Sequence, residues 1–178
     1  MASLFRPALD LMAQYAAYHR DRRNIATHFV GIPLIVFAVS VLFARAEFTV
    51  GDTPMNAAIV VWAVTALWYL TRGSLALGAA TAIVNGVLTA LAMMAAQGST
   101  AGWLLVGVGS FVVGWVFQFV GHYYEGRKPA FVDDLVGLLV GPLFVSTEVL
   151  FALGLCRPLR QAIEAEAGPV QLRTPQSA

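Results

Sequence analysis

The sequence contains one uninterrupted stretch of 49 residues, Gly73 to Gly121, that has no Asp, Glu, Lys, Arg or His. A helix needs about 20 apolar residues to cross a bilayer core, so this stretch predicts two consecutive membrane spans. The polar cluster Gln97-Gly98-Ser99-Thr100 is typical of a turn and marks the break between them. Shorter uncharged stretches before Arg45 and before Arg72 predict two further crossings. The four expected spans are about 29–46, 54–72, 74–96 and 101–121.

The composition agrees with an integral membrane protein, since 58% of residues are hydrophobic, 12% are charged and the mean hydropathy is +0.73. A net charge of +1 without a basic block excludes a nucleic-acid partner. The single cysteine, Cys156, excludes an internal disulfide framework and a CxxC metal site. The length suits one membrane-embedded catalytic domain, expected at 1–160, followed by a mobile C-terminal tail at 161–178.

Both ends of the chain depart from simple spans. Apolar residues at helical spacing between Leu4 and His19 predict an amphipathic helix, either in the headgroup plane or packed across the ends of the bundle. The apolar region 131–156 is interrupted by Gly141-Pro142, and Pro142 disfavours a continuous helix there. We therefore expect a C-terminal re-entrant helical hairpin, with a fifth span as the alternative. The predicted fold class is an all-α integral membrane protein.

The positive charges set the expected orientation, because Lys and Arg favour the cytoplasmic side. Four arginines precede the first expected span, and Arg127 and Lys128 follow the fourth. The N-terminus and the segment after Gly121 are therefore expected in the cytoplasm. The ten arginines against one lysine suit a GC-rich bacterial source and hence a bacterial inner membrane.

The chain has only three histidines, and the predicted topology brings them to one membrane face. His28 opens the first expected span, His122 closes the fourth, and His19 lies just before them. His19 and His28 are nine residues apart, which on one helix would put them on opposite faces. They converge only if the chain turns between them, and Asp21 suits the start of a new helix.

Three imidazoles near several carboxylates form a ligand set suited to iron, zinc or manganese. Glu125 is three residues after His122 and shares its helix face, so the candidate metal ligands are His19, His28, His122 and Glu125. The alternative carboxylates are Asp133, Asp134 and Glu148. A carboxylate inside an apolar region, such as Glu148, is usually functional or paired.

Two groups of residues resemble a known family. The first is Tyr18-His19 followed by Asn24, His28, Gly31 and Pro33; the second is Trp115 to His122 followed by Glu125, Pro129-Ala130, Asp133 and Gly141-Pro142. Together they resemble the small membrane family of Fe(II)-dependent 2-hydroxy fatty acid dioxygenases, over roughly residues 10–156. Arg20 stands where fungal members carry an additional histidine, and Glu125 follows its histidine by three residues rather than four. Whether Glu125 or a later carboxylate completes the ligand set stays open.

The resemblance implies α-oxidation of a long-chain 2-hydroxy fatty acid by O2 to the acid one carbon shorter and CO2. It implies Fe(2+) as cofactor, held by His19, His28 and His122, and an endoplasmic reticulum location in eukaryotic relatives. The hypothesis places the fatty acid tail in the membrane lipid and its carboxylate at the headgroup level. The candidate substrate-binding residues are Arg20, Arg127 and Lys128 for the carboxylate, with Asn24, Tyr15, Tyr18 and Gln118 around the metal.

Two other functions remain open from the sequence. A noncatalytic lipid-binding scaffold or carrier would bind no stoichiometric metal, and a zinc-dependent lipid hydrolase would act without oxygen. Chain-length preference, the number of metal ions and the oligomeric state are also open. Gly107, Gly114 and Gly121 recur every seven residues and predict a close helix contact, within or between chains.

Overall fold

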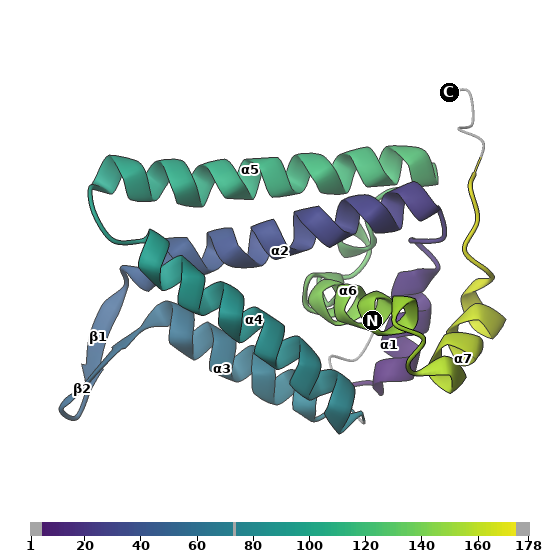
Figure 1. Cartoon of the computed structure of the whole chain (residues 1–178), viewed down its shortest axis with the longest axis horizontal. Coiled ribbons are helices and arrows are strands. Elements are labelled where there is room, and N and C mark those ends of the chain that lie inside the picture. The colour runs from purple at the N-terminus through teal and green to yellow at the C-terminus, as the bar shows by residue number, and fades with distance from the viewer. Residues whose placement is uncertain (1–4, 73, 174–178) are drawn as a thin grey trace.

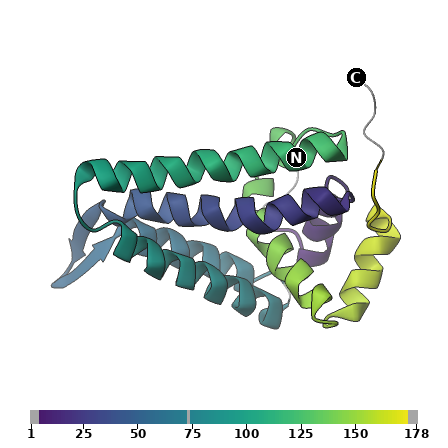
Figure 2. The ribbon, with the colours of Figure 1, turned by 45° about the horizontal axis from the view of Figure 1, so that its top comes forward.

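The computed structural model describes residues 5–72 and 74–173, and these residues form an almost entirely helical bundle (Figure 1). Three long helices make up its body: α2 (Arg22–Ala44), α4 (Leu75–Ala95) and α5 (Thr100–Glu125). In both ribbon views α2 lies between α5 on one side and α4 with α3 (Ala57–Leu70) on the other (Figures 1 and 2). The bundle end that contains the start of α2 and the end of α5 is covered by α1 (Ala8–Ala16), α6 (Gly137–Ala152) and α7 (Arg157–Ala167).

Polar residues at the helix starts explain where the long elements begin. The side chains of Asp21, Asn56, Ser74 and Ser99 each accept a hydrogen bond from a backbone N–H in the first turn of the helix that follows. These N-caps satisfy donors that have no partner within the helix. The turn predicted at 97–100 is confirmed, because α4 ends at Ala95 and α5 begins at Thr100.

The structure contains three helices that are long and apolar enough to cross a membrane, namely α2, α4 and α5, and up to four if the bent α6–α7 pair counts as one span. The expected span at 54–72 is shorter than predicted, since α3 has 14 residues and is about 21 Å long. Its expected first residues instead form β2 (Thr53–Asn56), which pairs antiparallel with β1 (Glu47–Val50). Sequence reasoning missed this exposed hairpin.

The predicted helix break at Gly141-Pro142 is wrong, because α6 continues through Pro142 to Ala152. The chain bends further on, at residues 153–156, where Gly154 and Cys156 adopt left-handed backbone angles (φ 77° and 54°). The α6 and α7 axes meet there at 118°, the geometry of a broken span or a re-entrant loop. The C-terminal tail is expected from residue 161, but in the structure α7 continues to Ala167 and Ile163 is buried.

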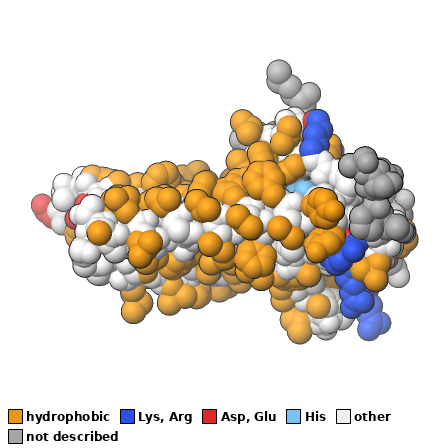
Figure 3. All heavy atoms as spheres, turned by 90° about the horizontal axis from the view of Figure 1, so that it is seen from above, with side chains coloured by type: hydrophobic (Ala, Val, Ile, Leu, Met, Phe, Trp, Pro, Cys, Tyr) orange, Lys and Arg blue, Asp and Glu red, His pale blue; other side chains and the backbone are white. Residues whose placement is uncertain are grey.

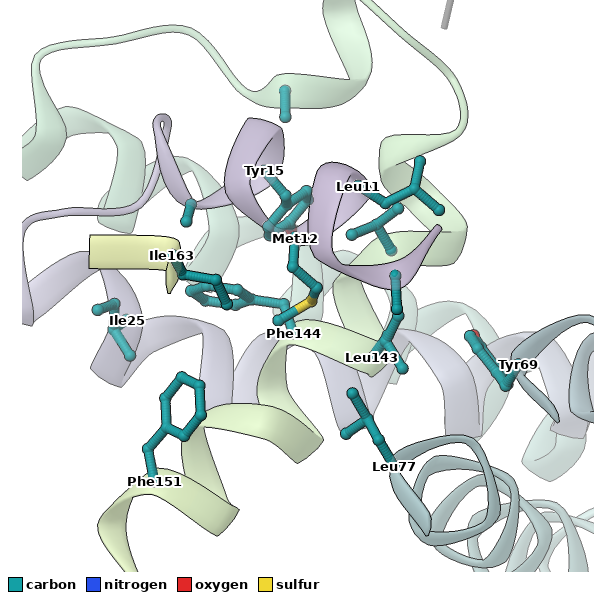
Figure 4. Packing of buried hydrophobic residues seen from close by; sticks show 14 of the residues in the cluster. Leu11, Met12, Tyr15, Ile25, Tyr69, Leu77, Leu143, Phe144, Phe151 and Ile163 are labelled. Atoms are coloured by element: carbon teal, nitrogen blue, oxygen red, sulfur yellow. The ribbon is translucent and has the colours of Figure 1, made fainter. Parts of the chain in front are cut away.

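The N-terminal helix belongs to the folded core. Six of the nine residues of α1 are buried, and they pack against α6 and α7 across the end of the bundle. Figure 4 shows Met12 and Tyr15 of α1 meeting Phe144 of α6 and Ile163 of α7. Of the two expected placements, packing across the bundle is the one observed; Leu4 of the predicted stripe lies outside the described residues.

The surface of the long helices is hydrophobic, as membrane association requires. Large apolar side chains on α4 and α5 stay exposed, including Leu105 (76%) and Ile83 (65%). Figure 3 shows hydrophobic atoms along the whole body, with Lys and Arg gathered at one end and histidine atoms visible near them. The regular spacing of Gly107, Gly114 and Gly121 serves a contact within the chain, since each glycine faces α2.

Candidate metal centre

The three histidines meet inside the protein, as the sequence predicts. His19 lies in the turn between α1 and α2, His28 in the second turn of α2, and His122 in the last turn of α5. All three are buried, and one ring nitrogen of each lies within 4.8 Å of the others. They come from three separate parts of the chain, so the fold itself builds the cluster.

The hydrogen bonds of His19 and His28 fix which nitrogens face inward. His19 Nδ1 lies 2.7 Å from the carbonyl of Tyr15, and His28 Nδ1 lies 2.9 Å from the carbonyl of Asn24. A carbonyl only accepts, so each Nδ1 donates its proton outward and each Nε2 keeps a lone pair. These two Nε2 atoms are 3.0 Å apart. Lone pairs facing each other at this distance repel, and a cation bound to both nitrogens removes the repulsion.

The third histidine supplies another candidate ligand nitrogen. His122 Nδ1 is buried and has no hydrogen-bond partner among the residues that the structure describes. Burial, and then the neighbouring His28 and His122, lower the pKa of His19 well below its ordinary value. His19 is therefore neutral, which is the form that binds metals. Three buried neutral imidazoles, two of them oriented by backbone carbonyls, could hold a metal ion.

Close contact between α2 and α5 brings His28 and His122 together. A Cβ on Gly31 would overlap the Gln118 side chain and lie 2.8 Å from the Gly114 carbonyl oxygen. A Cβ on Gly121 would likewise overlap the side chains of Thr27 and Asn24. The glycines thus allow the two helices to approach closely next to the metal-binding nitrogens.

Glu125, an expected ligand, is not part of the histidine group found among the described residues. Its carboxylate accepts hydrogen bonds from the backbone N–H groups of Arg20 (3.0 Å) and Asp21 (2.7 Å) and from Asn24 Nδ2 (3.1 Å). It also forms an ion pair with Arg173 at 3.1 Å. Glu125 therefore holds the turn that positions His19.

The three alternative carboxylates also have other partners. Asp133 accepts from Tyr18 and Lys128 at the surface, and these hydrogen bonds, Lys128 first, lower its pKa. Asp134 accepts from the backbone N–H of Val136. Glu148 faces Arg20 at 3.9 Å. None of the three belongs to the histidine group found among the described residues.

The cations expected to bind a substrate carboxylate are engaged with the protein. The Arg20 guanidinium donates to the carbonyls of Ala16, His19 and Gly168. Arg127 donates to the Ala17 carbonyl, and Lys128 pairs with Asp133. Asn24 donates to Tyr18 and Glu125, so it belongs to the turn.

A small pocket of about 60 Å³ opens beside His28 and His122. Its walls are mostly apolar, and Tyr15 and Gln118 also line it. The Tyr15 ring stacks on His19 with centroids 4.1 Å apart. Gln118 Nε2 is buried without a hydrogen-bond partner in the described part of the chain. The pocket thus combines an apolar wall, the histidine nitrogens and one available amide donor. The residues that line it are Tyr15, His28, Ile32, Ile35, Val36, Trp115, Gln118, His122, Pro129, Ala130, Phe131, Gly137, Leu138, Gly141 and Pro142.

Comparison with known proteins identifies the family. Residues 5–153 match the family model described as Mpo1-like, 2-hydroxy-palmitic acid dioxygenase Mpo1-like. The chain belongs to the Mpo1-like family. Among curated relatives of this family, the 2-hydroxy-palmitic acid dioxygenase MPO1 of Saccharomyces cerevisiae is 32% identical over 163 residues, covering 88% of each chain. No solved structure matches. The family resemblance drawn from the sequence is therefore confirmed.

The Mpo1-like segment contains the histidine cluster and its pocket, but two supporting residues lie beyond it. Arg173, near the C-terminal end of the described residues, binds both the Glu125 side chain and its carbonyl oxygen. Gln171 pairs with Arg20 and Arg22 through its backbone, which holds the same turn. Sequence reasoning missed both residues, because nothing in their spacing indicates a contact with a turn about 150 positions earlier.

Proposed function

We propose that this chain is a membrane-bound dioxygenase that uses Fe(2+) to convert long-chain 2-hydroxy fatty acids to the acid one carbon shorter. One 2-hydroxy acid and one O2 give one shortened acid, one CO2 and one water, so the substrate supplies all the electrons that reduce oxygen. The observation that supports this most is the pair of buried Nε2 lone pairs 3.0 Å apart, beside His122 and at the wall of an apolar pocket. The family and its named yeast relative support the substrate class.

The residues present fit iron. His19, His28 and His122 would hold the metal, because neutral imidazole suits Fe(2+) as well as zinc, and three protein ligands leave positions for other groups. Iron bound there would supply the activation of O2. A 2-hydroxy acid has two adjacent oxygen donors, the hydroxyl and one carboxylate oxygen, which suit chelation of a metal held by few protein ligands.

The pocket residues would orient the substrate. Gln118 is the proposed donor to the substrate carboxylate, because its Nε2 is buried beside the histidines and has no partner among residues 5–72 and 74–173. A buried donor left without a partner costs about 1–3 kcal/mol, which a bound carboxylate would recover. Tyr15 keeps His19 in place through its carbonyl and its stacked ring, so it is a positioning residue. The apolar walls would exclude water from the reacting atoms.

The site lies at the basic end of the bundle, which supports an orientation. Arg22, Arg23, Arg127 and Lys128 flank the histidine end, whereas the β1–β2 hairpin at the other end carries Glu47 and Asp52. We infer that the histidine end faces the cytoplasm, in a bacterial inner membrane. The site would then lie at the headgroup level, where the carboxylate of a membrane-dissolved fatty acid is found.

Oxygen uptake with 2-hydroxypalmitate tests the proposal. Purified protein in detergent is expected to consume one O2 for each CO2 released, and His28→Ala is expected to abolish both. Asp52→Asn is the matched control, because Asp52 is exposed in the β1–β2 turn at the opposite end of the bundle. Lipid hydrolysis that continues without oxygen would instead identify a hydrolase. Absence of metal and turnover in folded protein would favour a scaffold or carrier.

A further inference from the structure

A second hollow adjoins the histidine pocket and extends into the membrane-facing part of the bundle. It has a volume of about 290 Å³ and lies between α2, α3, α4, α5 and α6. The two hollows share five lining residues: Ile35, Val36, Trp115, Leu138 and Pro142. We name the second hollow the tail groove.

The tail groove is hydrocarbon-like. Its walls include Val39 of α2, Val61 and Trp62 of α3, and Phe111 of α5. The hydroxyls in it are already paired, since those of Ser40 and Thr89 hydrogen-bond each other at 3.2 Å and the Tyr69 hydroxyl donates to the Leu139 carbonyl. The ring N–H of Trp115, in contrast, is buried without a partner among the described residues. Methylene groups could therefore lie along the groove without leaving these hydroxyls unsatisfied.

The groove runs away from the histidines along α2. From His28 to Ser40 the helix advances about 18 Å, which is comparable with an extended palmitoyl chain. The antiparallel helix α5 presents its residues in the matching order, with His122 and Gln118 at the first pocket, Trp115 in both hollows and Phe111 in the tail groove. A chelated head group at the histidines would thus direct an alkyl tail past Trp115.

We propose that the tail groove binds the alkyl tail of the 2-hydroxy acid and sets the longest chain that the enzyme accepts, with Val39 and Val61 at its far end. This inference rests on the proposed function. Val61 is 39% exposed, so the groove is also open to the surrounding lipid, from which the substrate would enter laterally. Val39 and Val61 are therefore the proposed specificity-determining residues, because the size of their side chains sets how far the groove extends. They do not contact the reacting atoms.

The first test is a chain-length series for kcat/KM with Val39→Trp and Val61→Trp. An indole at the far end leaves the last methylenes of a palmitoyl tail no room, and such overpacking costs about tenfold in kcat/KM. We therefore expect kcat/KM to fall at least roughly tenfold for 2-hydroxypalmitate and to stay unchanged for 2-hydroxydecanoate. Full activity toward 2-hydroxydecanoate would also show that the variants fold. Val64→Trp is the matched control on the same helix, because Val64 is 63% exposed and does not line the groove. An unchanged chain-length profile in both groove variants would overturn the inference.

The second test does not depend on turnover. A 2-hydroxy fatty acid with a diazirine on its terminal carbon is photolysed with the whole protein, and the labelled residues are mapped by mass spectrometry. We expect labels around Val39 and Val61 that excess 2-hydroxypalmitate displaces. Labels spread over lipid-facing positions such as Val64, or labels that the acid cannot displace, would assign the groove to bulk lipid and overturn the inference. An inactive wild-type protein with displaceable groove labels would reject the proposed reaction while keeping the groove.

Discussion

Replacing Glu125 with Gln distinguishes a residue that holds the turn from a metal ligand. In the structure one carboxylate oxygen, Oε2, accepts from the backbone N–H groups of Arg20 and Asp21 and from Asn24, whereas Oε1 pairs with Arg173. A glutamine carbonyl placed at Oε2 keeps the first three hydrogen bonds, but the charge and the ion pair are lost. Hydrogen bonds to a charged group contribute about 1.5–3 kcal/mol and neutral ones about 0.5–1.5 kcal/mol.

The expected destabilisation of Glu125→Gln is therefore about 2–4 kcal/mol. For a chain of this size that lowers the unfolding temperature by roughly 5–15 °C. Metal content per folded chain is expected to stay at the wild-type level, because the three histidines keep their geometry. Differential scanning fluorimetry in detergent and metal analysis of the same sample measure both quantities. Loss of the metal with an unchanged unfolding temperature would show that Glu125 is a ligand and refute this reasoning.

Three further predictions follow from the same end of the bundle. In Gly31→Ala the added Cβ is expected to collide with Gln118 and push α5 away from α2. Metal retention, measured by chelator titration, is expected to weaken about tenfold, as is typical when residues that support metal ligands are disturbed. Truncation after Ala167 removes the segment that pairs with the His19 turn and is expected to weaken metal retention in the same assay; unchanged retention would contradict this. Hydrogen bonds, that from the Arg23 side chain first, lower the pKa of Asp21 to about 2. The C-terminal segment docks through a hydrogen bond to the ionised Asp21, so docking is expected to persist through pH 4 and to weaken as the pH falls toward 2. Limited proteolysis across this pH range measures the docking. Release of the segment already at pH 5 would contradict the prediction.

The sequence could predict the meeting of the histidines because topology alone requires it. The four expected crossings, an even number, bring His28 and His122 to one end of the bundle, and the Asp21 cap supplies the turn that His19 needs. In the structure α2, α3, α4 and α5 give the same result, although α3 is shorter than a full span. The caps at the other helix starts are equally local signals. These features depend on neighbouring residues and on whether the number of crossings is even or odd, and a single sequence shows both.

The features that the sequence could not predict depend on contacts between distant segments. Spacing places Glu125 on the same helix face as His122, but only the approach of the 20–21 turn, Asn24 and Arg173 gives its carboxylate four other partners. Pro142 is a local signal for a helix break, but tertiary contacts keep the helix continuous. The α6 residues before and after Pro142 are buried, and the helix packs against α1 and α2. Arg173 carries no pattern at all and gains its role from α7, which turns the chain back to the site.

Metal analysis of anaerobically purified, tag-free protein, with His28→Ala and His122→Ala beside it, tests the central claim most directly. We expect about one iron per wild-type chain and its loss in both variants, while both variants remain folded. Wild-type protein that is folded but holds zinc, or variants that keep the iron, would contradict it.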